Sequence, residues 1–138
     1  MIPATTTWVV LDTNIVLDLF VFHDPKAQTL LQALQAKELQ WIATVPMRQE
    51  LMLVLQYPHI AKRTNEHSRA EQVLEIFDAM VVLQPVAAKA PITCKDPDDQ
   101  KFIDLAVDHQ AHIWSKDRAV RCMRKRLQAL GATFCAWP

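Results

Sequence analysis

The chain has 138 residues, of which 51% are hydrophobic and 22% are charged, and its fifteen basic residues balance fifteen acidic ones. This length and composition predict a single folded domain, residues 1–138, with a sizeable core, and they exclude a disordered chain. Because the net charge is zero, any attraction to phosphate has to come from a local patch. The single glycine, Gly131, argues against a phosphate-cradling loop of the Walker or Rossmann type.

The N-terminus and the cysteines indicate where the protein works. Residues 1–7 lack the basic flank and the apolar run of a signal peptide, and no apolar stretch is long enough to span a membrane. Cys94, Cys122 and Cys135 are too widely spaced for a disulfide framework or a zinc site, which indicates reduced thiols. We therefore expect a soluble cytoplasmic protein.

The first half of the chain alternates short apolar runs with stretches of helical spacing. Residues 8–11 read as a buried strand, which Asp12-Thr13-Asn14 interrupts before a helix begins. Asp24 is placed to cap a second helix, with Pro25 at its first position. Further along the chain, the pattern predicts a strand at 41–43, a helix from about 45 to 55 that Tyr57-Pro58 ends, and a polar, basic loop with a helical turn at 59–67.

The second half continues the alternation. Ser68 and Glu71 form a capping box at the start of an amphipathic helix over 68–80. The remaining elements are a strand at 81–83, a loop at 84–93, a helix opened by Asp96-Pro97-Asp98-Asp99, a strand at 111–114, a helix over 118–130 stopped by Gly131, and a strand at 132–135. Alternating strands and helices predict a parallel sheet covered on both faces.

Four acidic residues are positioned to meet at one edge of that sheet. Asp12 and Asp117 follow predicted strands, and ligands of parallel sheets bind at the carboxyl ends of strands. Glu50 and Asp99 lie on helices that can face the same edge. Four carboxylates together repel one another unless a cation compensates them, and oxygen ligands of this kind suit Mg²⁺ or Mn²⁺. Such a site can activate water and stabilise charge on an attacked phosphodiester.

Each of these residues also has a plainer interpretation. Asp12 could merely end a strand, or Asp12 or Asn14 could cap the following helix, and for Asp12 taken alone this interpretation and a metal site are about equally favoured. Asp117 taken alone is better explained as a cap. One aspartate of the 96–99 segment is expected to cap its helix, where the dipole favours negative charge. Glu50 could be an ordinary solvated residue. The joint placement of the four, rather than any one position, indicates the metal site.

Four segments carry a resemblance to a known family: Val-Val-Leu-Asp-Thr-Asn-Ile at 9–15, Arg-Gln-Glu-Leu at 48–51, Asp-Pro-Asp-Asp-Gln-Lys-Phe at 96–102 leading into Ala106, and Ala-His-Ile-Trp-Ser-Lys-Asp at 111–117. From Val9 to about Phe134 the chain resembles a PIN domain, and more narrowly the toxin components of toxin–antitoxin systems. The resemblance implies a three-layer α/β/α sandwich with a mainly parallel sheet of four to five strands. It also implies a cytoplasmic, metal-dependent endoribonuclease that cleaves RNA.

The resemblance also assigns roles to individual residues. Asp12, Glu50, Asp99 and Asp117 match the acidic positions that hold the catalytic Mg²⁺ or Mn²⁺ in the family. Asn14 and Ser115 match supporting positions, the first ordering the site and the second presenting a hydroxyl. Asp96 and Asp98 are close enough to Asp99 to substitute for it or to assist. An antitoxin partner and a homodimer are further implications of the resemblance.

The chain departs from the family pattern next to the last aspartate. Members often carry glycine where this chain has Lys116, and Asp-Leu after the basic residue where it has Ala119-Val120. Lys116 beside the site either lowers metal affinity or contacts phosphate.

Contacts to RNA have to come from local basic residues. Arg118, Arg121 and Lys125 share one face of the predicted helix 118–130, with Arg124 near it, and Lys116 precedes them. A second basic stretch comprises His59, Lys62, Arg63 and His67. Ordinary solvated surface explains either patch somewhat better when it is taken alone, and a nearby metal site favours phosphate binding. Trp8, Trp41 and Trp114 lie in predicted strands and are expected in the core rather than as base-stacking platforms.

Two other functions compete with the ribonuclease. One is a PIN-like module that binds RNA or protein without cutting it. The other is a phosphotransferase of the haloacid dehalogenase type, which also begins with a strand that ends in aspartate. That chemistry usually needs a second aspartate two residues later, where this chain has Asn14.

Overall fold

The fold is built on a five-stranded sheet with the order β3-β2-β1-β4-β5, and every neighbouring pair is parallel. The computed structural model describes residues 6–65 and 69–136. The strands are β1 (Thr7–Leu11), β2 (Leu39–Ala43), β3 (Val82–Leu83), β4 (His112–Ser115) and β5 (Thr133–Ala136). The predicted parallel sheet of four to five strands is confirmed.

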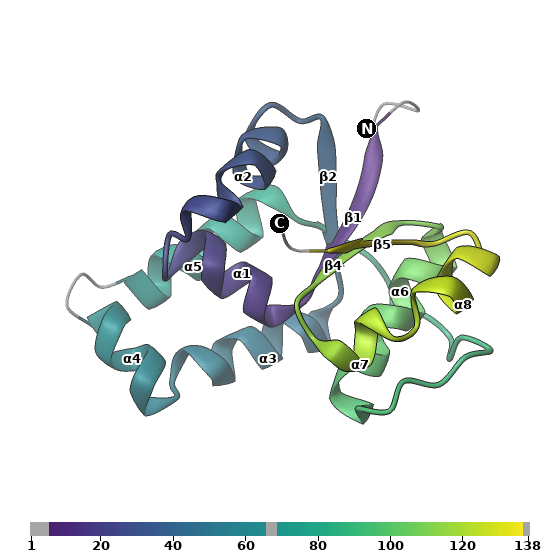
Figure 1. The fold of residues 1–138 in the computed structure, drawn as a ribbon. Coiled ribbons are helices and arrows are strands. Elements are labelled where there is room, and N and C mark those ends of the chain that lie inside the picture. The colour runs from purple at the N-terminus through teal and green to yellow at the C-terminus, as the bar shows by residue number, and fades with distance from the viewer. Residues whose placement is uncertain (1–5, 66–68, 137–138) are drawn as a thin grey trace.

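Helices cover both faces of this sheet, as Figure 1 shows. Helices α1, α2 and α5 lie on one side, and α6 and α8 pack against β1, β4 and β5 on the other. Within the described residues, no helix combines the length and apolar character needed to cross a bilayer. The α-helices are α1 (Thr13–Phe20), α2 (Gln28–Gln35), α3 (Val45–Leu55), α4 (Pro58–Asn65), α5 (Arg69–Met80), α6 (Gln100–His109), α7 (Arg118–Arg121) and α8 (Arg124–Ala129), and the 3₁₀ turns are η1 (Pro25–Ala27) and η2 (Pro97–Asp99).

The core lies on both faces of the central strands. Val9, Val10 and Ile113 are fully buried, as a parallel sheet with helices on both sides requires. Trp41 of β2 is also buried and packs edge-on against Phe77 of α5, with ring centroids 5.1 Å apart. The expectation that Trp41 belongs to the core is therefore confirmed.

The order of strands creates one point where a ligand site is expected. From β1 the chain moves outward to β2 and β3 and then returns to the other side of β1 for β4 and β5. Crossovers that leave in opposite directions open a crevice at the carboxyl ends of β1 and β4. Leu11 pairs with Trp114 there, and the Asp12 amide donates to the Trp114 carbonyl at 3.2 Å. The residues that follow β1 and β4 therefore meet.

The segment 59–67 is a helix in its larger part, so the predicted loop with a helical turn is wrong. Helix α4 begins at Pro58, whose missing N–H is not needed at the first helical position. Ile60 and Thr64, four residues apart, are buried together and hold the helix against the core, which a count of polar residues does not reveal. His67 lies outside the described residues. Ser68, which is predicted to form a capping box with Glu71, also lies outside them.

The predicted single helix over 118–130 is also wrong. The structure has two short helices, α7 and α8, joined by Cys122 and Met123. Val120, Met123 and Leu127 are all buried, and their spacing of three and four residues is that of one helical face, so the interruption does not change which side chains reach the core. Because α7 and α8 are separate helices, Arg118, Arg121 and Lys125 do not lie on one continuous helix. The chain turns after α8 at Gly131, whose φ of +87° is a conformation that favours glycine.

Candidate functional site

Asp12 makes two kinds of contact at the end of β1. One carboxylate oxygen caps α1 by accepting from the Ile15 amide at 3.1 Å, and the other accepts from the Ser115 hydroxyl. Only 3% of the residue is exposed. Burial raises the pKa of Asp12 to about 6, although the hydrogen bonds from Ser115 and Ile15 act in the opposite direction. Capping and site formation are thus compatible uses of the same side chain.

Ser115 connects this aspartate to the loop that follows β4. Its buried hydroxyl donates to Asp12 and accepts from the Asp117 amide at 3.0 Å. The Asp117 carboxylate in turn caps α7 by accepting from the Ala119 amide at 2.8 Å. A single hydroxyl therefore sets the relative position of the two aspartates that end β1 and β4.

Two further aspartates, Asp96 and Asp99, form an acidic cluster with Asp117. Asp96, Asp99 and Asp117 each offer a carboxylate oxygen, and these oxygens lie within 4.8 Å of one another. Burial and the neighbouring Asp117 carboxylate raise the pKa of Asp99 to about 8. Within the described part of the chain, the buried Oδ2 of Asp99 has no hydrogen-bond partner.

These features fit a divalent cation. A buried carboxylate oxygen without a donor is costly, and like charges held this close repel one another. A cation bound between the carboxylates removes both costs, and a set of oxygen donors suits Mg²⁺ or Mn²⁺. The carboxylate oxygens of this cluster are therefore the type of ligand expected for the Mg²⁺ or Mn²⁺ that the sequence predicted.

Glu50 is held next to the cluster by two other side chains. The Thr13 hydroxyl donates to one carboxylate oxygen, and the Lys101 ammonium lies 2.7 Å from the other. Lys101 also donates to the Asp98 carbonyl at 2.6 Å. Neither Thr13 nor Lys101 is among the predicted site residues, although both lie inside the segments that carry the resemblance. Their contacts join residues 37 and 51 positions apart, which no local spacing reveals.

The remaining predicted site residues take different places around a cleft of about 370 Å³. Exposed Asn14 lines it, and Asp96 lines it while capping η2 through the Asp98 amide at 2.9 Å. The Asp98 side chain is exposed and does not line the cleft. Of the 96–99 aspartates, the structure therefore brings Asp96 and Asp99 to the site. Its acidic lining residues are Asp12, Glu50, Asp96, Asp99 and Asp117.

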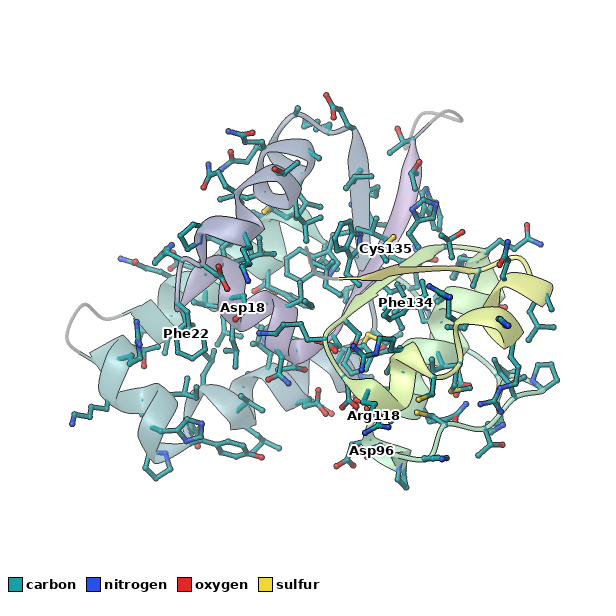
Figure 2. All side chains as sticks on the ribbon, in the orientation of Figure 1. Asp18, Phe22, Asp96, Arg118, Phe134 and Cys135 are labelled. Carbon is teal, nitrogen blue, oxygen red and sulfur yellow. The ribbon has the colours of Figure 1, made fainter. Side chains whose placement is uncertain are left out.

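None of the four residues predicted to bind RNA lines this cleft. The Lys116 ammonium lies 2.5 Å from the carboxylate of Asp18, a buried residue of α1. Arg118, Arg121 and Lys125 are exposed. Figure 2 shows Arg118 and Asp96 at the lower edge of the molecule, below the carboxyl ends of the strands. Their part in binding RNA stays a prediction.

Both the sequence and the fold of the chain are similar to those of known proteins. The sequence profile of the PIN domain matches residues 8–119. The fold is similar to that of VapBC2 from Rickettsia felis bound to a DNA fragment from their promoter, with a TM-score of 0.64 and 16% identity over 95% of this chain and 99% of that one. It is also similar to FitAB bound to the IR36 DNA fragment, with a TM-score of 0.57 and 16% identity over 94% of this chain and 96% of that one. No curated protein matches the sequence significantly.

Proposed function

The chain belongs to the PIN domain family, and from this premise we propose that it is a Mg²⁺- or Mn²⁺-dependent endoribonuclease, the toxin of a toxin–antitoxin pair. The observation that carries the proposal is the convergence of Asp12, Asp96, Asp99 and Asp117 in one cleft at the carboxyl ends of β1 and β4. The unpartnered oxygen of Asp99, within the described residues, supports it. The substrate we propose is single-stranded RNA.

We propose that Asp96, Asp99 and Asp117, whose carboxylate oxygens lie within 4.8 Å of one another, hold the metal together with Asp12, and that Glu50 lies beside them. A divalent cation there supplies positive charge to the attacked phosphodiester and lowers the pKa of the attacking water. The side chains of the protein position the proposed metal ligands relative to one another. Ser115 fixes Asp12 relative to the Asp117 loop through its two hydrogen bonds.

Thr13 and Lys101 hold Glu50 in the lining of the cleft, and we propose that its carboxylate orients the attacking water and accepts a proton from it. Lys101 also offsets part of the negative charge of the cluster, so the polyanionic substrate meets less repulsion. We therefore propose proton transfer and orientation, rather than the direct metal binding predicted from the sequence, as the role of Glu50.

The toxin assignment brings an antitoxin with it, and we propose a small partner protein that blocks the cleft. The fold is similar to those of VapBC2 and FitAB, and this similarity supports the choice of an antitoxin as the partner. A homodimer is a further proposal. Leu83 of the edge strand β3 and Val86 after it are exposed apolar side chains of the kind found at such interfaces.

Cleavage of single-stranded RNA in the presence of Mn²⁺ tests the proposed activity. The Asp12→Asn variant should lose more than the roughly 10–100-fold in rate that the loss of an outer-shell partner costs. Asp108→Asn, which removes an exposed carboxylate at the far end of α6, is the matched control and should cut as fast as wild type.

A non-catalytic PIN-like module is the second candidate, because Lys101 and Thr13 already engage both oxygens of Glu50. The same assay separates the two. If wild type cuts RNA no faster than Asp12→Asn, the enzyme is excluded and the binding module stands.

A further inference from the structure

The cleft that holds the acidic cluster has a second wall without any carboxylate. It is formed where the end of α1 meets α3 and α4. We call it the aromatic wall, and its residues are Leu17, Phe22, Val54, Tyr57, His59 and Ile60. Leu17 and Ile60 are buried and form an apolar floor, whereas Tyr57 and His59 are exposed. The same cavity therefore joins a charged end to an apolar, ring-lined end.

The rings of this wall are available to a ligand. Tyr57 is 50% exposed, and its ring centroid lies 6.3 Å from that of His59 at an angle of 38°. Phe22 lies between α1 and α4 in Figure 2 and carries the Arg63 guanidinium over its ring, 4.8 Å from the centroid. The half-exposed ring of Tyr57 therefore offers a face on which a ligand in the cleft can stack.

The charge around the wall selects the kind of occupant. Helix α4 has the sequence Pro-His-Ile-Ala-Lys-Arg-Thr-Asn and contains no acidic residue. Lys62 and Arg63 are exposed on it, and Arg63 lies over the ring of Phe22, so a positive charge stands beside the wall while the opposite end of the cleft is negative. Exposed rings beside cationic side chains are the combination that binds single-stranded nucleic acid, because bases stack on the rings and phosphates pair with the cations.

We propose that the aromatic wall is a nucleobase subsite, which stacks one base next to the phosphodiester held at the acidic cluster. This inference rests on the proposed function and names its substrate class as unpaired nucleotides. Tyr57 and His59 contact the base, and Arg63, beside Phe22, contacts the flanking backbone. Because a base inside a duplex has no free face, the subsite selects single-stranded RNA.

Short RNA oligonucleotides that carry 2-aminopurine test the subsite by the quenching of its fluorescence on stacking. All proteins carry Asp12→Asn so that binding is measured without cleavage. Tyr57→Ala should weaken binding about 5- to 100-fold, as expected for the loss of a stacked base, and should abolish the quenching. Tyr57→Phe should retain both. Leu53→Ala is the control, because Leu53 is an exposed apolar residue of α3 outside the cleft.

A fully abasic oligonucleotide of the same length separates the base from the backbone charge. The abasic oligonucleotide should bind the protein that carries Asp12→Asn alone as weakly as the intact oligonucleotide binds the protein that also carries Tyr57→Ala. His59→Ala provides a second variant on an exposed position if Tyr57→Ala does not fold. Equal binding of intact and abasic RNA, unchanged in both variants, overturns the subsite.

The outcomes distinguish failure of the subsite from failure of the nuclease. If wild type cuts RNA but Tyr57→Ala leaves base binding unchanged, the subsite is wrong and the nuclease stands. If wild type does not cut but quenching depends on Tyr57, the subsite stands in a binding module. If Tyr57→Ala instead abolishes only the binding of a co-expressed antitoxin, the wall is a protein-docking surface and the proposal is overturned.

Discussion

Ser115 is the residue on which the geometry of the site depends most. It is 1% exposed and is bonded to Asp12 and to the Asp117 amide at once. Its hydroxyl also keeps the pKa of Asp12 lower than burial alone would set it. One hydroxyl thus controls both the position and the proton affinity of a proposed metal ligand.

Replacement of Ser115 by alanine should therefore affect stability and metal binding together. Two buried partners lose a hydrogen bond, which should lower the free energy of unfolding by about 1–3 kcal/mol. The pKa of Asp12 should rise further, so the pH at which Mn²⁺ binding is half complete should move upward. Urea unfolding and Mn²⁺ titrations at several pH values measure the two effects. Thr133→Ala, at an exposed position of β5, is the control. An unchanged pH midpoint would show that Ser115 does not act on Asp12.

Between elements, the contact of Lys116 with Asp18 gives an unexpected role to a residue predicted to bind RNA. The Asp18 side chain is 7% exposed and lies on α1, while that of Lys116 is 39% exposed and follows β4. A buried carboxylate needs a partner, and Lys116 supplies it. The lysine that replaces the family's usual glycine therefore joins the loop after β4 to α1.

A double-mutant cycle tests this role. Lys116→Met leaves the Asp18 charge unpaired and should lower the free energy of unfolding by about 1–3 kcal/mol, less than for a fully buried pair because the lysine is partly exposed. Lys116→Met combined with Asp18→Asn should recover most of that loss, as measured by urea unfolding. If Lys116 instead contacts phosphate, Lys116→Met should weaken RNA binding by the same factor with and without Asp18→Asn.

The two incorrect helix predictions show which signals were ambiguous at this scale. Residues 58–65 contain few apolar side chains, so the burial of Ile60 and Thr64 against neighbouring helices decided their conformation. Residues 118–130 have good helical spacing, and Val120, Met123 and Leu127 are buried as that spacing predicts, but the spacing does not reveal the interruption between α7 and α8. Tertiary packing overrode the local pattern in α4.

For the whole molecule, the acidic cluster makes stability depend on pH and on metal. The pKa values of Asp12 and Asp99 are raised to about 6 and about 8. The folded, metal-free protein therefore binds more protons than the unfolded chain above about pH 4, so its stability falls as pH rises through the folded pKa values. We expect the Tm without metal to be higher at pH 5.5 than at pH 8, and Mn²⁺ to raise it more at pH 8. Thermal melts in EDTA and in Mn²⁺ measure this.

Asp99→Asn isolates the part of this effect that comes from the cluster. Removal of a raised pKa should stabilise the metal-free protein at pH 8 by about 1 kcal/mol or more. The Tm at that pH should rise by about 3 °C or more. The variant should gain little from Mn²⁺, and its Tm should approach that of wild type near pH 4. A variant that melts below wild type in EDTA at pH 8 would contradict the proposed electrostatic cost.

The sequence by itself determined the fold class and the identity of the acidic residues. Buried strands such as 8–11 are recognisable because their apolar runs and their boundaries are local properties. The positions of Asp12 and Asp117 after such strands predicted that they would meet, since parallel strands place their carboxyl ends at one edge. The structure brings them together there, joined through Ser115.

Only the tertiary structure decided which side chains surround those acids. The contact of Ser115 with Asp12 joins residues 103 positions apart, and that of Lys101 with Glu50 joins residues 51 apart. The pairing of Lys116 with Asp18 and the exposure of Tyr57 inside the cleft also depend on how helices pack against one another. Hydrogen bonds and ion pairs form within about 3 Å, so they are set by distances between elements, which local spacing along a chain does not contain.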